Sequence, residues 1–361
     1  MVHLGDIKKI HDPPFVDCIT FGSPCQDLSI AGKRAGLSGE RSGLFMEAVR
    51  IIKEMRCHSG GVYPTFAIWE NVPGAFSSNS GKDFHAVLEE LARIEGPEIS
   101  IPRPKNGKWA KAGVVCGDGW SIAWRTFDAQ FWGVPQRRRR IAVVVDFGGF
   151  RAGEILFERT GMSRNTEPRI QTWKGIARNP ADGAAGHDRV VGGAGFNGYK
   201  SVTGSIQYHT ETAATLEANM PGNVICLQGN IIDRNAQTVL KKTTLRWVVR
   251  RLTPTECERL QGFPDGWTNI GEWVDTKGKR HKAADSPRYK ALGNSIALPQ
   301  WWWITCKMAQ YLPEHATLGS LFDGIGGFPL VWETLHGKGT AVWASEIEEF
   351  PIAVTKARFP E

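Results

Sequence analysis

Short apolar runs alternate with amphipathic segments through the first 147 residues, and the same texture returns near residue 289. The predicted strands of the first part are Val16–Phe21, Thr65–Trp69, Ser121–Phe127 and Ile141–Phe147. Leu44–Met55 carries apolar residues at helical spacing, which predicts a helix between the first two strands. Because strands alternate with helices, the pattern predicts an α/β fold with a doubly wound, parallel sheet.

Residues 148–284 break this pattern. Glycine, threonine and asparagine become frequent, the apolar periodicity weakens, and Gly192-Gly193-Ala194-Gly195 is a turn signal. We therefore predict a smaller, irregular, β-rich domain over 148–284. It interrupts an α/β domain that is formed by residues 1–147 and 285–361.

The composition is that of a soluble globular enzyme, with 361 residues of which 41% are hydrophobic and 22% charged. The net charge of +7 mildly favours a polyanionic partner. Seven cysteines occur without a CxxC pair, which argues against a disulfide framework and fits a cytoplasmic protein. No apolar run has membrane-spanning length and no metal-ligand spacing occurs, so we expect neither a membrane partner nor a metal.

The turn after the first predicted strand is a candidate site of chemistry. Gly22 ends the apolar run, Pro24 fixes the backbone and Cys25 follows at once. Open α/β sheets present reactive groups just past the carboxyl ends of their strands. Cys25 is therefore either a nucleophile or a buried thiol at a strand end, whereas Cys18 lies inside the apolar run and is predicted to be a core residue.

A glycine-rich turn near the other end of the chain follows a predicted strand that ends at Phe322. Gly324, Gly326 and Gly327 allow the backbone to approach a ligand closely, and Pro329–Leu335 is predicted to be helical. Glycines of this kind can also serve only the tight packing of a strand against a helix. The next predicted strand therefore decides between the two interpretations.

That strand, Thr340–Ala344, is followed by Glu346, twenty residues past Gly326. Nucleotide-binding βαβ units place an acidic residue at this spacing to receive ribose hydroxyls. The GxxxxGK[ST] pattern of a phosphate loop is absent, and Asp323 would repel a pyrophosphate. An adenosine-bearing, cationic cofactor such as S-adenosylmethionine therefore fits this segment best.

Together with Cys25, these segments resemble the motifs of the C5-cytosine DNA methyltransferases over nearly all of the chain except its middle region. The segments that resemble the family are Gly5–Ile7, Gly22–Gln26, Trp69–Val72, Gln136–Arg140, Arg251–Pro264, Gly293–Ile296, Phe322–Phe328 and Glu346. Each motif is weak or moderate by itself, but the set is specific. The resemblance implies an S-adenosylmethionine-dependent methyltransferase sheet, with a target-recognition domain over 148–284.

The resemblance implies covalent catalysis. Cys25 would attack cytosine C6 and so make C5 nucleophilic, while Glu70 as a carboxylic acid would relieve negative charge at N3. Arg140 would hold the cytosine carbonyl oxygen or orient Glu70, and Arg138 and Gln136 are the other catalytic candidates. The alternative interpretation of Glu70 is a surface carboxylate, although the apolar residues just before it argue against free solvation. A solvated basic run that meets phosphates is the alternative for the arginines, and it describes Arg137 and Arg139 best.

S-adenosylmethionine is the cofactor that the resemblance implies, with S-adenosylhomocysteine as the product. The residues implied to bind it are Phe322, Asp323, Gly324, Gly326, Gly327, Glu346, Ile347, Asp6, Ile7, Pro24, Leu44, Asn294 and Ser295. Phe322 and Ile347 would sandwich the adenine, and Asp6 would accept a hydrogen bond from its amino group.

The order of the motifs departs from the family. The glycine turn usually comes first and the Gly-Asn-Ser motif last, whereas here the glycine turn and Glu346 close the chain. Joining residue 361 to residue 1 restores the usual order, with the old termini meeting in Leu312–Ala316. The order therefore predicts a circular permutation. Proteins tolerate such a change where the original termini lie near each other and the new cut falls in an exposed loop.

The sequence predicts a monomeric, cytoplasmic enzyme that methylates cytosine at a specific site in double-stranded DNA, as in restriction–modification. The target base would be flipped out of the duplex, and residues 27–43 would close over it as a mobile loop. Two other hypotheses stay open. One is a cytosine-C5 methyltransferase acting on RNA, and the other is a catalytically inactive DNA-binding relative.

Overall fold

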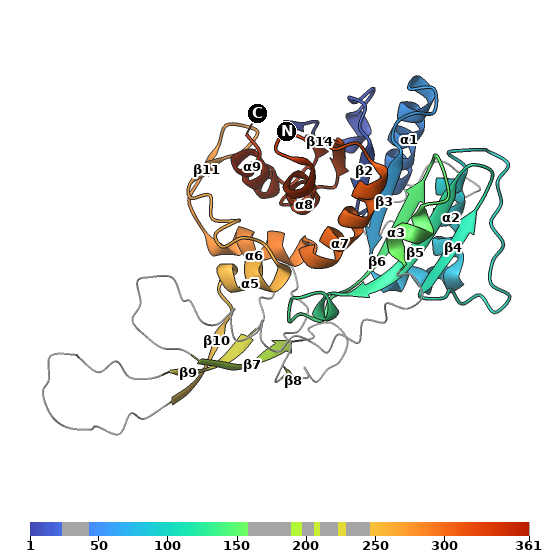
Figure 1. The fold of residues 1–361 in the computed structure, drawn as a ribbon. Coiled ribbons are helices and arrows are strands. Elements are labelled where there is room, and N and C mark those ends of the chain that lie inside the picture. Colours follow the sequence, from blue (N-terminus) through green and yellow to red (C-terminus); the bar gives the residue numbers. More distant parts are fainter. Residues whose placement is uncertain (24–42, 158–188, 197–205, 210–222, 229–245, 361) are drawn as a thin grey trace, which may run out of the picture. The chain divides into compact units, whose positions relative to one another are not determined.

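The computed structural model describes residues 1–23, 43–157, 189–196, 206–209, 223–228 and 246–360. The chain divides into two compact units (Figure 1). Unit 1 consists of Met1–Phe127, Arg139–Arg164 and Gln300–Glu361, and unit 2 consists of Asp128–Arg138 and Asn165–Pro299. The segments 128–138 and 285–299, which lie in the predicted α/β domain, thus group with unit 2.

An eight-stranded sheet forms the centre of the fold, with the strand order β1-β14-β13-β2-β3-β6-β5-β4. The strands are β1 (Val2–His3), β2 (Cys18–Phe21), β3 (Phe66–Asn71), β4 (Ala112–Cys116), β5 (Ser121–Asp128), β6 (Arg139–Asp146), β13 (Leu318–Leu321) and β14 (Ala341–Ser345). All six strands predicted from the apolar pattern are present, with ends shifted by one or two residues. The structure therefore confirms the α/β fold class.

The sheet is mixed, which corrects the prediction of a parallel one. The strands β1, β14, β13, β2 and β3 are parallel, but β6 is antiparallel to β3 and β4 is antiparallel to β5. Parallel neighbours need a crossover of a dozen or more residues. The connection between β4 and β5, residues 117–120, is far too short for one, so these strands form a hairpin.

Strand order reverses between β13 and β2. The chain leaves β13 for β14 on one side and leaves β2 for β3 on the other. The carboxyl ends of two such strands diverge into a crevice, which is where open α/β sheets bind their ligands. The glycine turn follows β13 and the Gly22–Cys25 turn follows β2, so both candidate segments leave the sheet at this switch point.

Helices of unit 1 cover the sheet. They are α1 (Gly43–His58), α2 (Lys82–Ala92), α3 (Ala152–Leu156), most of α7 (Leu298–Met308), α8 (Gly327–His336) and α9 (Glu349–Arg358), with 3-10 turns η1 (Ile7–Lys9), η3 (Pro73–Phe76), η4 (Ser78–Gly81) and η6 (Ala309–Tyr311). The predicted helices Leu44–Met55 and Pro329–Leu335 correspond to α1 and α8. Phe45 of α1 and Phe84 of α2 pack on either side of Trp69 from β3, which fixes one face of the core.

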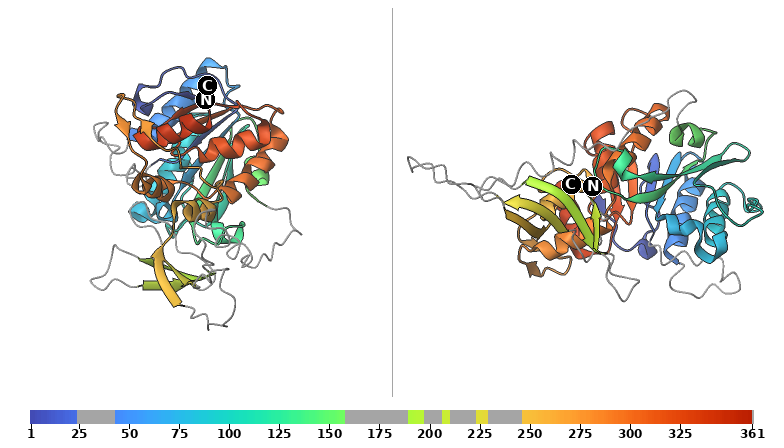
Figure 2. Two further views of the ribbon diagram at one scale, coloured as in Figure 1. Left: turned by 90° about the vertical axis from the view of Figure 1, so that its left-hand side faces the viewer. Right: turned by 90° about the horizontal axis from the view of Figure 1, so that it is seen from below.

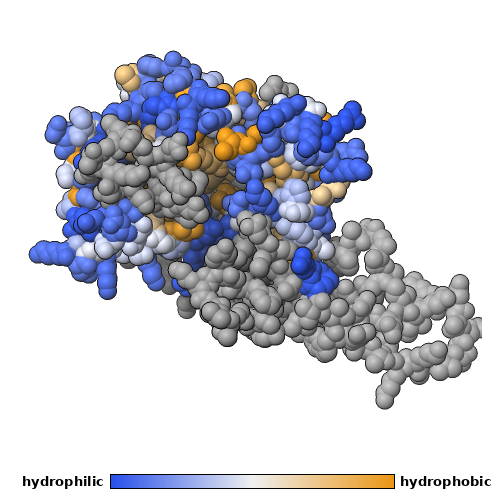
Figure 3. Space-filling view, turned by 180° about the vertical axis from the view of Figure 1, so that it is seen from behind, coloured by the Kyte–Doolittle hydropathy of each residue, from blue (hydrophilic) through white to orange (hydrophobic). Residues whose placement is uncertain are grey.

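The helices bury their apolar side chains against the sheet, so few large hydrophobic side chains of the described residues are exposed on the surface. On the face that Figure 3 presents, the described surface is mostly hydrophilic, with apolar residues gathered in small groups. Among the described residues no helix is both long enough and apolar enough to cross a membrane.

Both chain ends join the same edge of the sheet. β1 pairs with β14, and the Ser345 hydroxyl donates to the Gly5 carbonyl oxygen over 2.7 Å. The Nε2 atom of His3 lies 3.0 Å from Oγ1 of Thr355 in α9. The two ends are therefore neighbours, as Figures 1 and 2 show.

Unit 2 contains a four-stranded antiparallel sheet of order β10-β9-β7-β8. Its described elements are β7 (Arg189–Phe196), β8 (Ile206–His209), β9 (Asn223–Gln228), β10 (Arg246–Arg251), α5 (Pro254–Gln261), β11 (Trp273–Val274), β12 (Arg280–His281), α6 (Asp285–Asn294) and the turn η5 (Ala129–Phe131). The four strands lie inside the segment predicted to be β-rich. Its role as a recognition domain stays a prediction.

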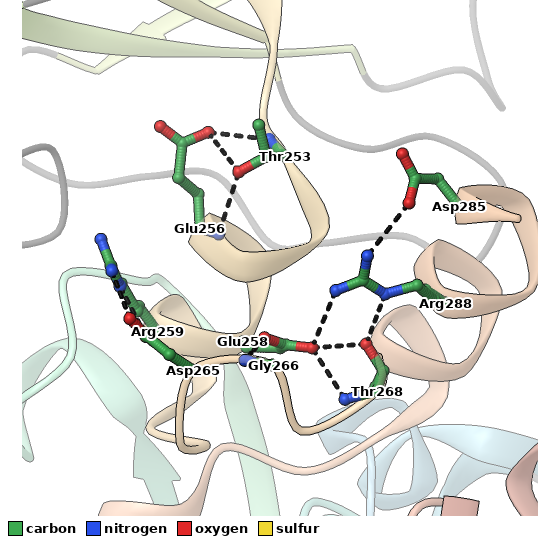
Figure 4. A network of polar contacts seen from close by, with 9 residues as sticks. All are labelled: Thr253, Glu256, Glu258, Arg259, Asp265, Gly266, Thr268, Asp285 and Arg288. Atoms are coloured by element: carbon green, nitrogen blue, oxygen red, sulfur yellow. Dashed lines mark hydrogen bonds and ion pairs between the residues drawn. The ribbon is translucent and has the colours of Figure 1, made fainter. Parts of the chain in front are cut away.

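A buried carboxylate joins the helices of unit 2 (Figure 4). Glu258 of α5 is fully buried and accepts from the backbone N–H groups of Gly266 and Thr268 over 2.7 and 2.8 Å. Arg288 of α6 pairs with the same carboxylate at 3.3 Å. Because a buried charge must be paired and hydrogen-bonded, this network holds α6 against α5.

Candidate active site

An ion pair between Glu70 and Arg140 lies where β3 ends and β6 begins. The Nε atom of Arg140 is 2.8 Å from Oε1 of Glu70, and the two side chains are only 15% and 14% exposed. Antiparallel register places Glu70 opposite Ala142, so Arg140 comes to the end of β3 from a distant part of the chain. The structure thus pairs Arg140 with Glu70, and which of its two predicted roles Arg140 fills stays a prediction.

The turn that leads to Cys25 is fastened beside this pair. The Trp69 indole donates to Oγ of Ser23 over 3.2 Å, and the Asn71 side-chain amide donates to the Ser23 carbonyl oxygen over 3.0 Å. A Cβ atom on Gly22 would lie 3.1 Å from Oε2 of Glu70, so the turn and the carboxylate are in close contact. Sequence reasoning missed these anchors, although both donors flank Glu70.

Pro24 and Cys25 themselves lie outside the described residues, as does nearly all of the predicted mobile loop 27–43. The described chain stops at Ser23, two residues before the thiol. Its anchoring fixes where the segment to Cys25 starts, at the switch-point edge and next to Glu70. The position of the sulfur stays a prediction.

The glycine turn is tied to the strand that carries Glu346. The Gly324 N–H donates to Oε2 of Glu346 over 2.8 Å, and Oε1 accepts from the N–H groups of Ile347 and Glu348 over 2.8 and 2.9 Å. Gly326 has a φ of +78° and a Cβ atom there would come within 2.6 Å of the Phe359 ring. Glycine is therefore required at 326 by backbone conformation and by packing.

Other features of this edge fit a nucleoside-bearing cofactor. Around Gly324 a Cβ atom would meet nothing within 4 Å, so there is open space over the turn. Ile347 exposes 67% of its apolar side chain, and Phe322 is half-buried beside the same turn. An exposed apolar side chain next to a carboxylate suits a ligand with a flat apolar ring and a polar sugar.

The remaining predicted cofactor contacts of unit 1 differ in their surroundings. Asp6, at the carboxyl end of β1, is partly exposed and accepts from the Lys8 N–H over 3.1 Å. Leu44 is half-buried in the first turn of α1. Ile7 is buried in the core cluster, and its carbonyl oxygen accepts from Arg50 over 3.3 Å.

Asp323 is a buried carboxyl group in the glycine turn. The Ser320 hydroxyl donates to its Oδ1 over 2.6 Å, and Oδ2 has no partner among the described residues. Burial raises the pKa of Asp323 to about 8, with a smaller contribution from Glu346. The side chain is therefore mostly neutral at pH 7, so the predicted repulsion of a pyrophosphate is weaker than the sequence indicated.

This buried acid predicts a pH-dependent stability. The folded-state pKa is raised to about 8 from 3.8, so the folded state binds more protons and the parent loses stability as pH rises from about 4 to 8. Asp323→Asn removes this loss. The free energy of unfolding of the variant, relative to that of the parent, should therefore increase by about 3 kcal/mol between pH 5 and pH 8. Urea unfolding of the cofactor-free proteins measures it, and an advantage that is the same at both pH values contradicts the assignment.

The other predicted site residues belong to unit 2. Arg138 is 1% exposed and donates to the carbonyl oxygens of Gly293 and Ser295, so it holds the turn that contains Asn294. Gln136 is fully buried, and its side-chain amide has no partner among the described residues. Glu70 is paired with Arg140 rather than Arg138. The assigned roles of these unit 2 residues stay predictions.

Within the described part of the chain, no group of three or more histidine, cysteine, aspartate or glutamate side chains could hold a metal ion.

A glycine turn and an acidic residue at the switch point of a doubly wound sheet define the class of α/β proteins that bind nucleotide-like cofactors. A sequence model of the C-5 cytosine-specific DNA methylase family matches residues 1–95 and 115–308. The chain belongs to this family.

Several curated methyltransferases are also similar to this chain. The DNA N-6-adenine-methyltransferase of Escherichia phage P1 is 29% identical over 84% of this chain and 54% of its own length. The type II methyltransferase M.BsuFI of Bacillus subtilis is 31% identical over 82% of this chain and 58% of its own length. M.HpaII of Haemophilus parainfluenzae is 26% identical over 82% and 73%. The chain thus spans little more than half of the first two relatives.

Proposed function

We propose that this chain is a site-specific DNA (cytosine-5-)-methyltransferase. The observation that carries the proposal is the Glu70–Arg140 pair, in contact with the Gly22 turn that leads to Cys25. A half-buried carboxylate fixed by an arginine beside a candidate nucleophile is suited to covalent attack on a ring that must also be protonated. Membership of the cytosine-specific family supports the same chemistry.

The chain's own residues divide the reaction into two easier steps. The Cys25 thiolate adds to C6 of the cytosine, and Glu70 as an acid donates its proton toward N3, which leaves electron density on C5. Arg140 holds the Glu70 carboxyl group in place. After C5 is methylated, water accepts the C5 proton, which restores the C5–C6 double bond and expels the Cys25 thiolate, and N3 returns its proton to Glu70. Because C6 is hidden in the base stack, the target cytosine must first be flipped out.

S-adenosylmethionine, when bound, supplies an electrophilic methyl group. The proposed contacts in unit 1 are Glu346, Gly324, Phe322, Ile347 and Asp6, with the unpaired Oδ2 atom of Asp323 beside them. Glu346 would receive the ribose hydroxyls, and Ile347 and Phe322 would contact the adenine. Asn294 and Ser295 stay proposed cofactor contacts on the strength of their sequence motif.

One assay tests the proposal. The purified protein is incubated with labelled S-adenosylmethionine and mixed-sequence double-stranded DNA, and the product nucleosides are separated. We expect 5-methylcytosine, and bisulfite sequencing of the product gives the target sequence. N6-methyladenine, the product expected from the name of the phage P1 relative, would overturn the cytosine assignment. Label only on transfer RNA would favour the RNA hypothesis, and DNA binding without transfer would favour an inactive relative.

We also propose that the chain is a circular permutant of its family. Counted from β13, the parallel strands lie in the order 3-2-1-4-5 of a doubly wound sheet. The family match ends at residue 308, before the glycine turn. The contact between His3 and Thr355 supports the view that β14, α9 and β1 form one continuous unit.

Rejoining the ends tests the permutation. We expect a variant that joins residue 361 to residue 1 through a short Gly-Ser linker, and opens between the exposed residues Pro313 and Glu314, to fold and to methylate DNA within about threefold of the parent. Circular dichroism and the methyl-transfer assay measure this. A control opened inside β3 should not fold. An insoluble or inactive rejoined variant would argue against the permutation.

A further inference from the structure

A basic loop joins α2 to the edge strand β4. It carries Arg103, Lys105, Lys108 and Lys111, all of them exposed, and these four residues are called the basic loop below. No acidic residue occurs between residues 99 and 117. Within the part of the chain that the structure describes, none of the four cations has an ion-pair partner. The match to the family model leaves out residues 96–114, which include this loop.

The basic loop has a fixed backbone. The Trp109 indole N–H donates to the Gly81 carbonyl oxygen over 2.8 Å, and its ring packs edge-on against Phe84 at 5.2 Å. Arg103 donates to the Ser80 carbonyl oxygen over 2.9 Å. A Cβ atom on Gly81, which has a φ of +77°, would lie 2.5 Å from the Gly107 carbonyl oxygen, so the two turns are in direct backbone contact. The backbone that carries the cations is therefore anchored at Arg103, Gly107 and Trp109.

The turn η4, to which the basic loop is bound, places this loop at the end of β3 that carries Glu70, which is called the active-site edge of the sheet below. η3 and η4 follow directly on Asn71, the last residue of β3 and the neighbour of Glu70. The basic loop is bound to η4, and its last residue returns to the sheet where the Thr126 N–H donates to the Lys111 carbonyl oxygen over 2.8 Å. In Figure 1 this segment connects α2 and β4 at one side of the sheet.

Four fixed cations without a counter-charge repel one another, which an ordinary solvated loop avoids by mixing in acidic residues. A polyanion removes this repulsion and releases its own counterions on binding. We propose that the basic loop contacts the phosphates of the DNA whose cytosine enters the active site. The proposal rests on the proposed function for the identity of the polyanion.

Salt dependence of DNA binding tests the proposal. Log affinity falls with log salt concentration by about 0.9 for each phosphate contacted. The basic-loop variant is a triple substitution, Lys105→Gln, Lys108→Gln and Lys111→Gln. We expect its slope to be shallower than that of the parent by about 2 to 3. We also expect it to bind target and non-target duplexes more weakly to the same degree. The matched control replaces Lys53, Lys338 and Lys356 with glutamine, which removes the same charge at exposed positions away from the active-site edge.

The two triple variants have the same net charge, so a general charge effect moves both slopes equally. A shallower slope in the basic-loop variant alone supports the proposal, and equal slopes in both variants overturn it. Fluorescence anisotropy measures binding without catalysis, so the result does not depend on methyl transfer. If the parent transfers methyl groups but the basic-loop variant keeps the parental slope, only the proposal for the basic loop is wrong. If the parent does not transfer methyl groups but the basic-loop variant alone has a shallower slope, only the methyltransferase assignment is wrong. A parent that does not bind DNA overturns both.

Discussion

Replacing Cys25 with serine should lower methyl transfer to DNA by about 10³-fold or more, because the covalent step then has no effective nucleophile. A serine hydroxyl is far less ionised than a thiol at neutral pH and is therefore a much weaker nucleophile. Steady-state transfer of labelled methyl groups measures the loss. Binding of the cofactor, measured by calorimetry, should stay within about twofold of the parent.

Cys57→Ser is the matched control for this prediction. Cys57 is an exposed free cysteine near the end of α1, and it has no role in the proposed reaction. Its substitution should leave transfer unchanged, which shows that loss of a thiol as such is harmless. A second result separates mechanism from folding: the parent, but not Cys25→Ser, should form a covalent complex with DNA that contains 5-fluorocytosine. Transfer by Cys25→Ser at the parental rate would remove Cys25 from the mechanism.

Replacing Glu70 with glutamine should lower the rate constant of transfer by about 10²- to 10⁴-fold, the range for loss of a general acid. Glutamine keeps the size of the side chain and can still accept from Arg140, so the fold should be preserved. The carboxyl proton is what the substitution removes. Single-turnover kinetics with saturating DNA and cofactor measure the chemical step and leave binding out of the comparison.

Glu54→Gln provides the control for this substitution. Glu54 is paired with Arg50 on α1 at 2.8 Å, so the control removes one glutamate from an arginine that keeps Glu47 as its second partner. We expect its transfer rate to equal that of the parent. If Glu54→Gln and Glu70→Gln lose activity to the same degree, the effect of Glu70 is one of stability and its proposed role as an acid is wrong.

Much of the α/β part could be predicted because its signals are local. The apolar runs around Ile19, Ile68 and Val143 are buried on both faces of the sheet, and such strands are recognisable without knowing their neighbours. The glycine turn and Glu346 were found for a similar reason, since a strand, a turn and a helix close in sequence fix their spacing. The structure joins them through the bond from Gly324 to Glu346.

Strand direction and charge state could not be predicted in this way. The apolar run of β6 is the same for a parallel and an antiparallel strand, so the sequence could not tell that β6 runs against β3. Asp323 was interpreted as an ionised group that repels a pyrophosphate, because the sequence does not show whether a carboxyl group is buried. Its raised pKa comes from burial in the folded structure, which the local sequence does not reveal.

By itself, the sequence determined the class of fold, the positions of most strands and the set of motifs that place the chain in its family, because these depend on local periodicity and spacing. Only the tertiary structure decided that Arg140 pairs with Glu70, that Trp69 and Asn71 hold Ser23, and that the basic loop rests on the turn after β3. Each of these contacts joins residues far apart in the chain. They arise when strands pair and side chains pack, and no local pattern encodes such pairing.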